Sequence, residues 1–377
     1  VVIPHNNLVF INKIYTINNS LILEVRKNGL PEITIFNLIT GSQSDISFED
    51  HAYDVSLSSN NEKENLKFNY SYSSLTCPES IYSYDLDKNK SNLLWQKNIV
   101  GFDKADYEDK RLFVEVRDGT KVPVIFLSKV GIDIKNAPIL FYGYGSYGIN
   151  IDATFRSSIL PLIDRGFVFA IINIRGGGEM GKQWYEEGRL LNKMNTFNDF
   201  NDVIKSVLNQ NIGDSSKVFA RGGSAGGLLM GAIINLEPSL YKGILSGVPF
   251  VDVLTTMSDP TIPLTTFEYG EWGNPANMNE YNYIKEYSPY DNIGNYNYPA
   301  VFVTSSLYDS QVQYFEPAKY IAKLREYNQS NNNIIMKMNL IGGHGGLSGR
   351  LNQFKEISDE YSFILNLAEE DNKKPPL

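Results

Sequence analysis

Short hydrophobic runs alternate with turn residues in the N-terminal part of the chain, up to Ala105. Leu21–Val25 and Ile33–Phe36 are two of these runs, and both contain the apolar and β-branched residues that strands favour. Asn18-Asn19-Ser20 is one of the stretches between runs, and such asparagine and serine clusters favour turns. The pattern therefore predicts antiparallel sheet in this part of the chain.

A hairpin is predicted next along the sequence. Leu112–Val116 and Val122–Leu127 are both β-prone, and Asp118-Gly119 lies between them as a strong signal for a tight turn. We expect this hairpin to open a second domain, so we divide the chain into residues 1–105 and 106–377. Two domains also agree with the chain length, because 377 residues exceed what a single core usually supports.

From Pro138 onward, apolar strands alternate with segments of helical periodicity. The predicted strands are short enough to be buried on both faces, and they are Ile139–Tyr142, Val168–Ile174, Val218–Ala220, Ile244–Val248, Ala300–Thr304 and Ile334–Leu340. The predicted helices place apolar residues three and four apart, and they are Phe197–Leu208, Ala225–Leu236, Tyr314–Tyr327 and Phe354–Leu367. This alternation predicts an α/β fold with a mostly parallel, doubly wound sheet.

One strand-to-helix junction carries a motif with chemical meaning. The strand Val218–Ala220 runs into Arg221-Gly222-Gly223-Ser224-Ala225-Gly226-Gly227, which contains G-x-S-x-G, and an apolar helix follows. A nucleophilic serine presented above a sheet needs such a sharp turn, and glycines on both sides remove clashing side chains. Glycine-rich turns can also bind phosphate, but those use a different glycine spacing and often a lysine. The motif therefore indicates an α/β-hydrolase with Ser224 as nucleophile.

A serine nucleophile needs a base, which is normally a histidine held by a carboxylate. The chain has only three histidines, and His5 and His51 lie in the β-rich N-terminal part. His344 follows the last predicted strand within Gly342-Gly343-His344-Gly345-Gly346, where a loop can bring an imidazole to the sheet edge. We predict His344 as the base by elimination and by this placement.

The acid should lie between serine and histidine in chain order, after a late strand. Asp309 meets this requirement, because it follows the predicted strand Ala300–Thr304. Asp291 is the nearest rival, and its Ser288-Pro289-Tyr290-Asp291-Asn292 setting is more typical of a turn or a helix cap. Asp309 is therefore the predicted acid.

The developing oxyanion also needs hydrogen-bond donors. One should be the backbone N–H of Ala225, directly after the nucleophile. The segment Tyr142–Gly148 follows the first predicted parallel strand, where hydrolases carry their second donor, and a tyrosine hydroxyl there could serve. An ordinary aromatic turn is an equally good interpretation of that segment from the residues alone.

Composition and charge narrow the functional classes. The net charge of −9 and the pI near 5.1 argue against general affinity for nucleic acid or anionic membranes. Cys77 is the only cysteine, so an intrachain disulfide and a cysteine-based metal cluster are excluded, and a cytoplasmic location fits best. No apolar run is long enough to span a bilayer, and no H-E-x-x-H motif indicates a metallohydrolase. We expect no cofactor and no metal.

Beyond these single motifs, the chain resembles the prolyl oligopeptidase family of serine peptidases, and within it the oligopeptidase B subfamily. The resemblance rests on ordered blocks at Tyr142–Gly148, Arg175–Glu179, Gly222–Gly227, Val248–Leu254, Glu271–Pro275, Asp309–Gln313 and Gly343–Gly346. It implies a catalytic triad of Ser224, Asp309 and His344, with Tyr144 as the oxyanion donor. It also implies hydrolysis of short peptides after arginine or lysine, which carboxylates in the specificity pockets would bind.

Two candidate specificity residues follow from the same resemblance. Glu268 resembles one of two glutamates that bind the basic side chain before the scissile bond, but the position expected for the second is Gly270, with Glu271 next to it. Asp152 resembles one acidic residue of the adjoining subsite, whose usual acidic companion is Thr154 here. Basic selectivity therefore rests on fewer carboxylates than the subfamily pattern provides.

The family resemblance also implies a β-propeller before the hydrolase domain. At about 40 to 50 residues per blade, the N-terminal part has room for about two blades, so we expect a truncated propeller with exposed sheet edges. A fragment, a split-gene partner or a decaying gene product would account for this. The alternatives to a peptidase are an esterase on the same fold and an inactive fragment or degenerate homologue, and the oligomeric state is not predicted.

Overall fold

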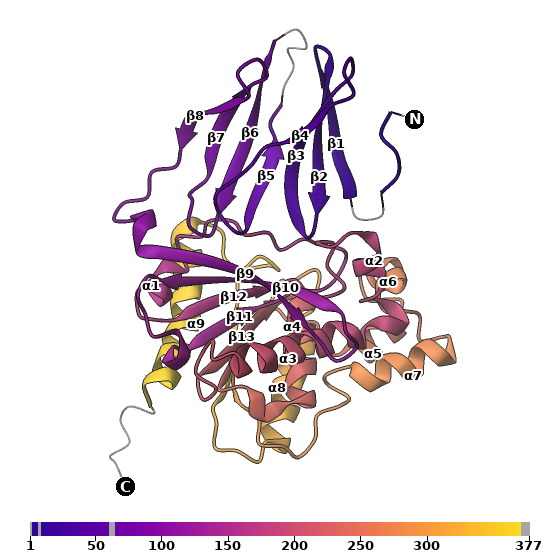
Figure 1. Ribbon diagram of the computed structural model, residues 1–377. Helices are drawn as coiled ribbons and strands as arrows, with labels where there is room; N and C mark the ends of the chain where they lie inside the picture. Colours follow the sequence, from indigo (N-terminus) through magenta and orange to yellow (C-terminus); the bar gives the residue numbers. More distant parts are fainter. Residues whose placement is uncertain (1, 7–8, 60–64, 371–377) are drawn as a thin grey trace.

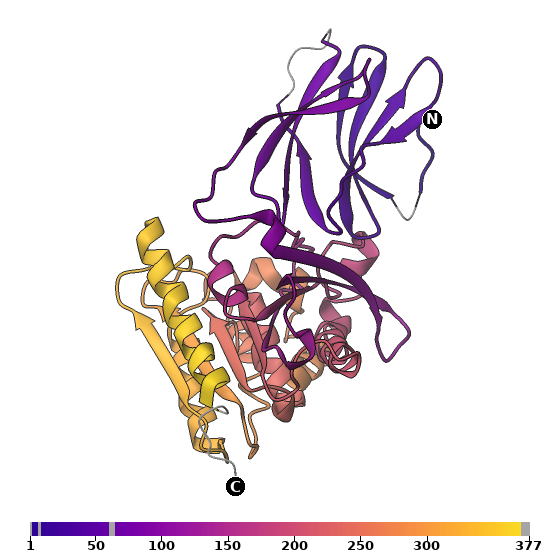
Figure 2. The same cartoon turned by 60° about the vertical axis from the view of Figure 1, so that its left-hand side comes forward.

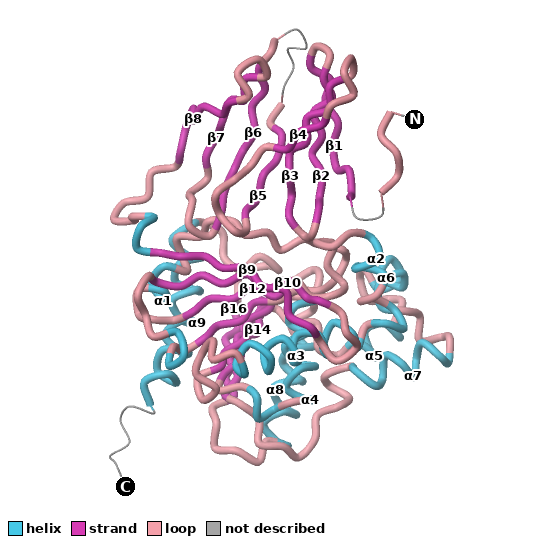
Figure 3. Tube along the Cα trace, viewed as in Figure 1, coloured by secondary structure: helices cyan, strands magenta, loops and turns pink. Residues whose placement is uncertain are grey.

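The computed structural model of the protein describes residues 2–6, 9–59 and 65–370. Two small antiparallel sheets lie side by side above one large sheet (Figure 1). Figure 3 shows that the described residues of the upper unit form strands and loops only, whereas the helices gather around the large sheet and at the junction. The chain therefore folds into a β-rich N-terminal portion and an α/β portion.

The two small sheets have four strands each. The first sheet contains β1 (Val9–Ile17), β2 (Ser20–Lys27), β3 (Leu30–Asn37) and β4 (Gln43–Asp45), in that order. The second contains β5 (Tyr53–Leu57), β6 (Lys67–Ser74), β7 (Ser80–Asp85) and β8 (Lys90–Gln96), also in order. Four-stranded up-and-down sheets are the blades of a β-propeller. The expected two-blade propeller portion is confirmed.

Packing between the two blades explains why they stay together. The inner sides of the blades share one apolar cluster, in which Ile22 and Ile33 of the first blade contact a layer that includes Val55, Phe68 and Tyr70 of the second. Each of these side chains is almost fully buried. Alternation along the strands places these residues on the shared face, because successive side chains point to opposite sides.

The large sheet has eight strands in the order β16-β15-β14-β13-β11-β12-β10-β9. Their bounds are β9 (Tyr107–Glu115), β10 (Lys121–Lys129), β11 (Ile139–Tyr142), β12 (Val168–Ile172), β13 (Val218–Gly223), β14 (Gly243–Gly247), β15 (Ala300–Ser306) and β16 (Ile334–Asn339). The pairs from β12 to β16 are parallel, and the β9–β10 hairpin joins antiparallel at one edge. This arrangement confirms the predicted α/β-hydrolase fold class.

Helices cover both faces of the large sheet. The α-helices are α1 (Leu160–Ile163), α2 (Lys182–Glu186), α3 (Met194–Asn209), α4 (Ala225–Leu236), α5 (Val253–Ser258), α6 (Thr265–Trp272), α7 (Met278–Tyr287), α8 (Phe315–Tyr327) and α9 (Arg350–Glu370), and the short 3₁₀ helices are η1 (Lys104–Asp106), η2 (Ile134–Asn136), η3 (Leu190–Asn192) and η4 (Pro238–Leu240). Figure 2 shows α9 running beside the strands at one edge of the sheet.

Alternation along β11 illustrates how the two faces form. Ile139 and Phe141 join the larger core with α3, α4 and α8, whereas Leu140 joins the second core with α1 and α9. All three side chains are buried, so the strand is apolar throughout rather than alternating with polar residues. Continuous apolar runs of this kind were the sequence signal for the parallel strands.

The predicted elements agree with the structure within a few residues, and the differences have physical causes. The helix predicted from Phe197 begins earlier, at Met194, because the polar residues Asn195 and Thr196 interrupt the apolar pattern that marked its start. The strand predicted at Val218–Ala220 continues to Gly223, since the backbone of the glycine turn still pairs with β14. The hydrophobic pattern of the sequence identifies the apolar centre of each element, so these two predictions are shorter than the observed elements at a polar or glycine-rich end.

Polar contacts join the propeller portion to the hydrolase portion. The Arg26 guanidinium on β2 donates two hydrogen bonds to the Asp152 carboxylate, at 2.8 and 2.7 Å. The Phe155 N–H donates to Ser73 Oγ at 3.0 Å. The predicted boundary after residue 105 falls inside η1, just before β9 begins at Tyr107; the division itself stays a prediction.

Arg26→Met tests how strongly this ion pair holds the two portions. The Arg26 side chain is only 5% exposed, and Asp54 and Glu179 add negative charge near it. Removing the guanidinium leaves Asp152 uncompensated, so we expect the free energy of unfolding to fall by about 3 to 5 kcal/mol in urea titrations. Lys67→Met is the matched control, because Lys67 is 55% exposed and 3.8 Å from Asp85; its loss should stay below about 1 kcal/mol. Equal losses would contradict the account.

Candidate active site

Ser224 lies at the sharp turn where β13 ends and α4 begins. Its backbone adopts φ 58° and ψ −119°, which is unusual for a residue with a side chain. Its N–H donates to the carbonyl of Gly247 at 2.8 Å, and its own carbonyl accepts the N–H of Gly227 at 2.8 Å. These bonds to the neighbouring strand and to the helix hold the turn in its strained conformation.

Glycines next to Ser224 permit this close approach of strand and helix. A Cβ added at Gly222 would lie 2.2 Å from the carbonyl oxygen of Gly226, which no side chain could tolerate. A Cβ at Gly226 would lie 2.9 Å from the carbonyl oxygen of Gly143. The glycine spacing of the motif is therefore a steric requirement of the turn, as the sequence predicted.

Asp309 and His344 are brought together by the loops that follow β15 and β16. The His344 Nδ1 atom lies 3.0 Å from Oδ1 and 2.8 Å from Oδ2 of Asp309. The Asp309 side chain is fully buried, and its Oδ1 accepts the N–H groups of Gln311 and Val312 at 2.9 Å each. Such a carboxylate fixes the orientation of an imidazole whose Nδ1 carries the proton, leaving Nε2 as the basic atom.

Ser224 and His344 line different cavities in this structure. Ser224 lines a cavity beside α5 and α6, whereas His344 lines a neighbouring one beside α9. Within the described part of the chain, no hydrogen bond joins the Ser224 hydroxyl to His344. Hydrogen bonds between catalytic groups are often long without substrate and tighten on binding, so this spacing is compatible with a shared site. Asp291, the rival acid, is exposed in the turn after α7.

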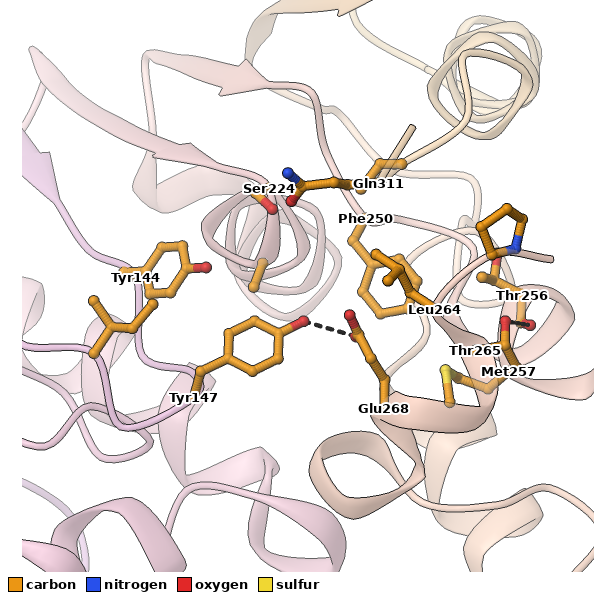
Figure 4. A pocket seen from close by; sticks show the side chains of 14 residues that line it. Tyr144, Tyr147, Ser224, Phe250, Thr256, Met257, Leu264, Thr265, Glu268 and Gln311 are labelled. Atoms are coloured by element: carbon orange, nitrogen blue, oxygen red, sulfur yellow. Dashed lines mark hydrogen bonds between the residues drawn. The ribbon is translucent and has the colours of Figure 1, made fainter. Parts of the chain in front are cut away.

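The predicted oxyanion donors lie beside Ser224. Figure 4 shows the Tyr144 hydroxyl pointing toward Ser224, and both residues line the same cavity. Burial raises the pKa of Tyr144 to about 12. The phenol is therefore protonated at neutral pH and able to donate. Ala225 is the first residue of α4, where backbone N–H groups have no intrahelical acceptor.

The cavity next to Ser224 has a volume of about 250 Å³ and mixed walls. Apolar side chains make up much of its surface, and among them are Phe250, Met257, Leu264 and Val312. Glu268 supplies a carboxylate to the same cavity (Figure 4). A cavity with apolar walls and one acidic group can accept a long side chain that ends in a cation.

Glu268 and Glu271 have different surroundings although both lie on α6. Glu268 Oε2 accepts the Tyr147 hydroxyl at 2.7 Å and the Trp272 indole N–H at 2.6 Å. Glu271 is buried, and it accepts the backbone N–H of Tyr147 at 2.8 Å and the Tyr185 hydroxyl at 2.5 Å. Glu268 therefore faces the cavity, whereas Glu271 supports the loop that carries Tyr147.

Asp152 lies away from the Ser224 cavity. Its carboxylate is occupied by Arg26, and it does not line that cavity. Thr154, at the position of the expected acidic companion, donates its backbone N–H to the Asp152 carbonyl at 2.9 Å. The structure thus brings Glu268 to the candidate site but joins Asp152 to the propeller portion.

Tyr147 and Gln311 line the Ser224 cavity but were not singled out from the sequence. Tyr147 lies within the Tyr142–Gly148 segment, which the sequence marked as a candidate part of the site. Its hydrogen bond to Glu268 was not predictable, because the two residues are 121 positions apart in the chain. Gln311 follows Asp309 closely and lies in the same loop. Neither role could be assigned without knowing which loops meet.

Metal ligation and membrane insertion receive no support from the described residues. The described residues contain no group of three or more His, Cys, Asp and Glu side chains that could hold a metal ion. Among the helices that the structure describes, none combines the length and the apolar composition needed to cross a lipid bilayer.

A mostly parallel sheet that carries a strained serine between strand and helix defines the class of the α/β-hydrolases. Comparison with family models gives the narrower assignment: residues 153–371 match the prolyl oligopeptidase family, and residues 1–97 match the N-terminal β-propeller domain of prolyl oligopeptidases. The chain belongs to the prolyl oligopeptidase family.

Individual relatives agree with this assignment. The chain is 43% identical over 97% of its length to dipeptidyl aminopeptidase BI of Pseudoxanthomonas mexicana and 40% identical over 97% to protease 2 of Moraxella lacunata. It covers 50% and 53% of those proteins, so it spans about half the length of the curated relatives it matches. The structure of oligopeptidase B from Leishmania major superimposes with a TM-score of 0.91 at 37% identity, over 98% of this chain and 53% of that one.

Gly222→Ala and Gly223→Ala form a matched pair that tests the steric account of the turn. At Gly222 the new methyl group would collide with the Gly226 carbonyl, so we expect about 1 to 3 kcal/mol of lost stability. At Gly223 the nearest atom would be the Gly247 carbonyl oxygen at 3.5 Å, an ordinary contact, so stability should change by less than about 1 kcal/mol. Urea unfolding of both variants measures the difference. Similar losses in the two would show that close packing at Gly222 does not control the turn.

Proposed function

We propose that the chain is a serine peptidase that hydrolyses short peptides through Ser224, His344 and Asp309. The observation that carries the proposal is the pairing of His344 Nδ1 with the buried Asp309 carboxylate at 2.8 Å, on loops next to the strained Ser224 turn. The similar proteins named above are a dipeptidyl aminopeptidase, a protease and an oligopeptidase. What these names have in common is cleavage of peptide bonds.

In the proposed mechanism, the Ser224 Oγ attacks the scissile carbonyl while His344 Nε2 takes its proton. The tetrahedral oxyanion accepts hydrogen bonds from the Tyr144 hydroxyl and the Ala225 N–H. The C–N bond then breaks, and the leaving amine takes the proton from His344 Nε2. Water next loses a proton to Nε2 and attacks the acyl-enzyme, which releases the acid and restores Ser224. Asp309 stabilises the imidazolium in both halves of the reaction.

We propose that the side chain before the scissile bond is arginine or lysine, bound by Glu268. The Glu268 carboxylate already accepts two hydrogen bonds through Oε2, so a cation would pair mainly with Oε1. The apolar wall at Phe250, Met257 and Leu264 suits the methylene groups of such a side chain. Asp152 stays a predicted subsite residue, and a substrate would have to compete with Arg26 for its carboxylate.

We also propose a domain division, a substrate size and a cellular location for the protein. Residues 1–105 form the propeller portion and residues 106–377 form the catalytic domain. The substrates are short peptides, as the resemblance to the oligopeptidases of the family implies. The location is cytoplasmic, which agrees with a single buried cysteine and hence with the lack of any intrachain disulfide.

Ser224→Ala and Asp309→Asn test the proposed triad. Turnover of fluorogenic peptides ending in arginine, proline or phenylalanine, and of a simple ester, would be measured with the purified chain. Ser224→Ala should lower turnover to the residual level, and Asp309→Asn should lower it by about four orders of magnitude through loss of imidazole orientation. Circular dichroism should show both variants folded. Unchanged turnover by Ser224→Ala would refute the nucleophile, and ester cleavage without peptide cleavage would favour an esterase.

Glu268→Gln tests the proposed selectivity. A charge-assisted hydrogen bond contributes about 1.5 to 3 kcal/mol, so the ratio of kcat/KM for arginine over phenylalanine substrates should fall about 10- to 100-fold. Glu286→Gln is the matched control, because Glu286 is exposed on α7 and does not line the Ser224 cavity. A ratio that stays the same in Glu268→Gln would exclude Glu268 as the selectivity residue.

A further inference from the structure

Lys193 is a fully buried lysine with an unusual environment. It lies between η3 and α3, and only 1% of its surface is exposed. Among the described residues, no carboxylate lies within ion-pair distance of its ammonium group. Its Nζ instead lies over the rings of Trp272 and Phe197, at 5.2 and 5.8 Å from their centroids. Lysine is almost never fully buried unless it is paired, so this position requires an explanation.

Two hydrogen bonds join the Lys193 side chain to the loop that carries Tyr144. Its Nζ donates to the carbonyl oxygen of Gly145 at 2.6 Å and to Ser146 Oγ at 2.8 Å. Ser146 is itself fully buried. Bulk water could therefore take the place of the Gly145 carbonyl or of Ser146 Oγ as acceptor only if the core opened. Two short hydrogen bonds from a buried cation therefore hold in place the part of the loop that directly follows Tyr144.

The same loop has an unfavourable backbone. Gly145, Tyr147 and Gly148 adopt φ of 68°, 60° and 64°, and this left-handed region is costly for a tyrosine. Such conformations persist only where the surroundings hold them. Lys193 holds the loop at Gly145 and Ser146, and Glu271 holds it at the Tyr147 N–H. Tyr144 lies at the start of this clamped segment, with its hydroxyl toward Ser224 (Figure 4).

Electrostatics agree with a role in holding the loop. Burial lowers the pKa of Lys193 to about 8, and the negative charge of Glu271 acts in the opposite direction. The lysine therefore still carries a proton at neutral pH and donates to the loop. A methionine of similar length could fill the apolar space between Phe197 and Trp272, so packing alone does not require an ammonium group here.

We propose that Lys193 is a positioning residue for the oxyanion donor Tyr144, acting through its hydrogen bonds to Gly145 and Ser146. This inference rests on the proposed function, because it requires Tyr144 to stabilise the tetrahedral oxyanion. Lys193 does not touch the reacting atoms. Its effect is expected on kcat rather than KM, because the oxyanion exists only in the transition state and the intermediate.

A double-mutant cycle between Lys193→Met and Tyr144→Phe tests the proposal. Tyr144→Phe should lower kcat for an arginine peptide about 100- to 1000-fold, as loss of one oxyanion donor does. Lys193→Met should lower kcat at least about tenfold in the presence of Tyr144, with KM changed less than about threefold. In the Tyr144→Phe background the same substitution should cost less than about twofold.

Lys205→Met is the matched control, since Lys205 lies on α3 but is 40% exposed and paired with Asp202 and Glu237. It should leave kcat unchanged in both backgrounds. If Lys193→Met lowers kcat equally with and without Tyr144, it acts only through general stability and the proposal is overturned. A kcat that Lys193→Met does not change in the presence of Tyr144 overturns it as well.

Ser146→Ala provides a second test of the proposal if Lys193→Met does not fold. This variant removes one acceptor of the ammonium and retains the bond to Gly145, so we expect a several-fold loss of kcat that disappears in the Tyr144→Phe background. A Ser146→Ala effect that is the same in both backgrounds would overturn the proposal. If Tyr144→Phe leaves turnover unchanged, the proposal is overturned, because Tyr144 is then not the oxyanion donor. If Ser224→Ala leaves turnover unchanged, the proposed function has failed instead, which separates the two claims.

Discussion

The close crossing of strand β13 and helix α4 at Ser224 is the constraint on which the site depends. Backbone atoms of the turn approach so closely that Gly222 and Gly226 have no room for a side chain. The serine itself adopts a strained conformation with positive φ, held by backbone hydrogen bonds to β14 and within α4. The parallel sheet therefore contributes directly to the site, because the pairing of β13 with β14 maintains the strained turn that exposes the Ser224 hydroxyl.

The carboxylates around this turn differ in burial and in partners, and they therefore have different roles. Glu268 faces the cavity with an accessible carboxylate, whereas Glu271, three positions later on α6, is buried and holds the Tyr147 backbone. Asp309 is buried beside His344, whereas Asp152 neutralises Arg26 between the propeller and hydrolase portions. A carboxylate near the site is therefore interpretable only with its partners, and sequence position does not specify them.

Local sequence predicted much of the fold and part of the site. Continuous apolar runs identified β11 to β16, and the glycine spacing around Ser224 identified the turn, because both are properties of adjacent residues. Chain order also predicted that Asp309 and His344 would meet, since parallel strands end at one edge of the sheet. The pairing of Arg26 with Asp152 was not predictable, because its members are 126 residues apart and on different units. The roles of Tyr147 and Lys193 likewise depend on contacts between distant loops.

Whether Ser224 is an activated nucleophile can be measured by treating the folded chain with diisopropyl fluorophosphate and mapping the modified peptide by mass spectrometry. This reagent forms a covalent adduct with a serine only where the hydroxyl is activated. We expect one adduct, on Ser224, with enzymatic turnover lost in proportion to labelling. A folded chain that remains unmodified, or that carries its adduct on another residue while Ser224 stays free, would contradict this expectation.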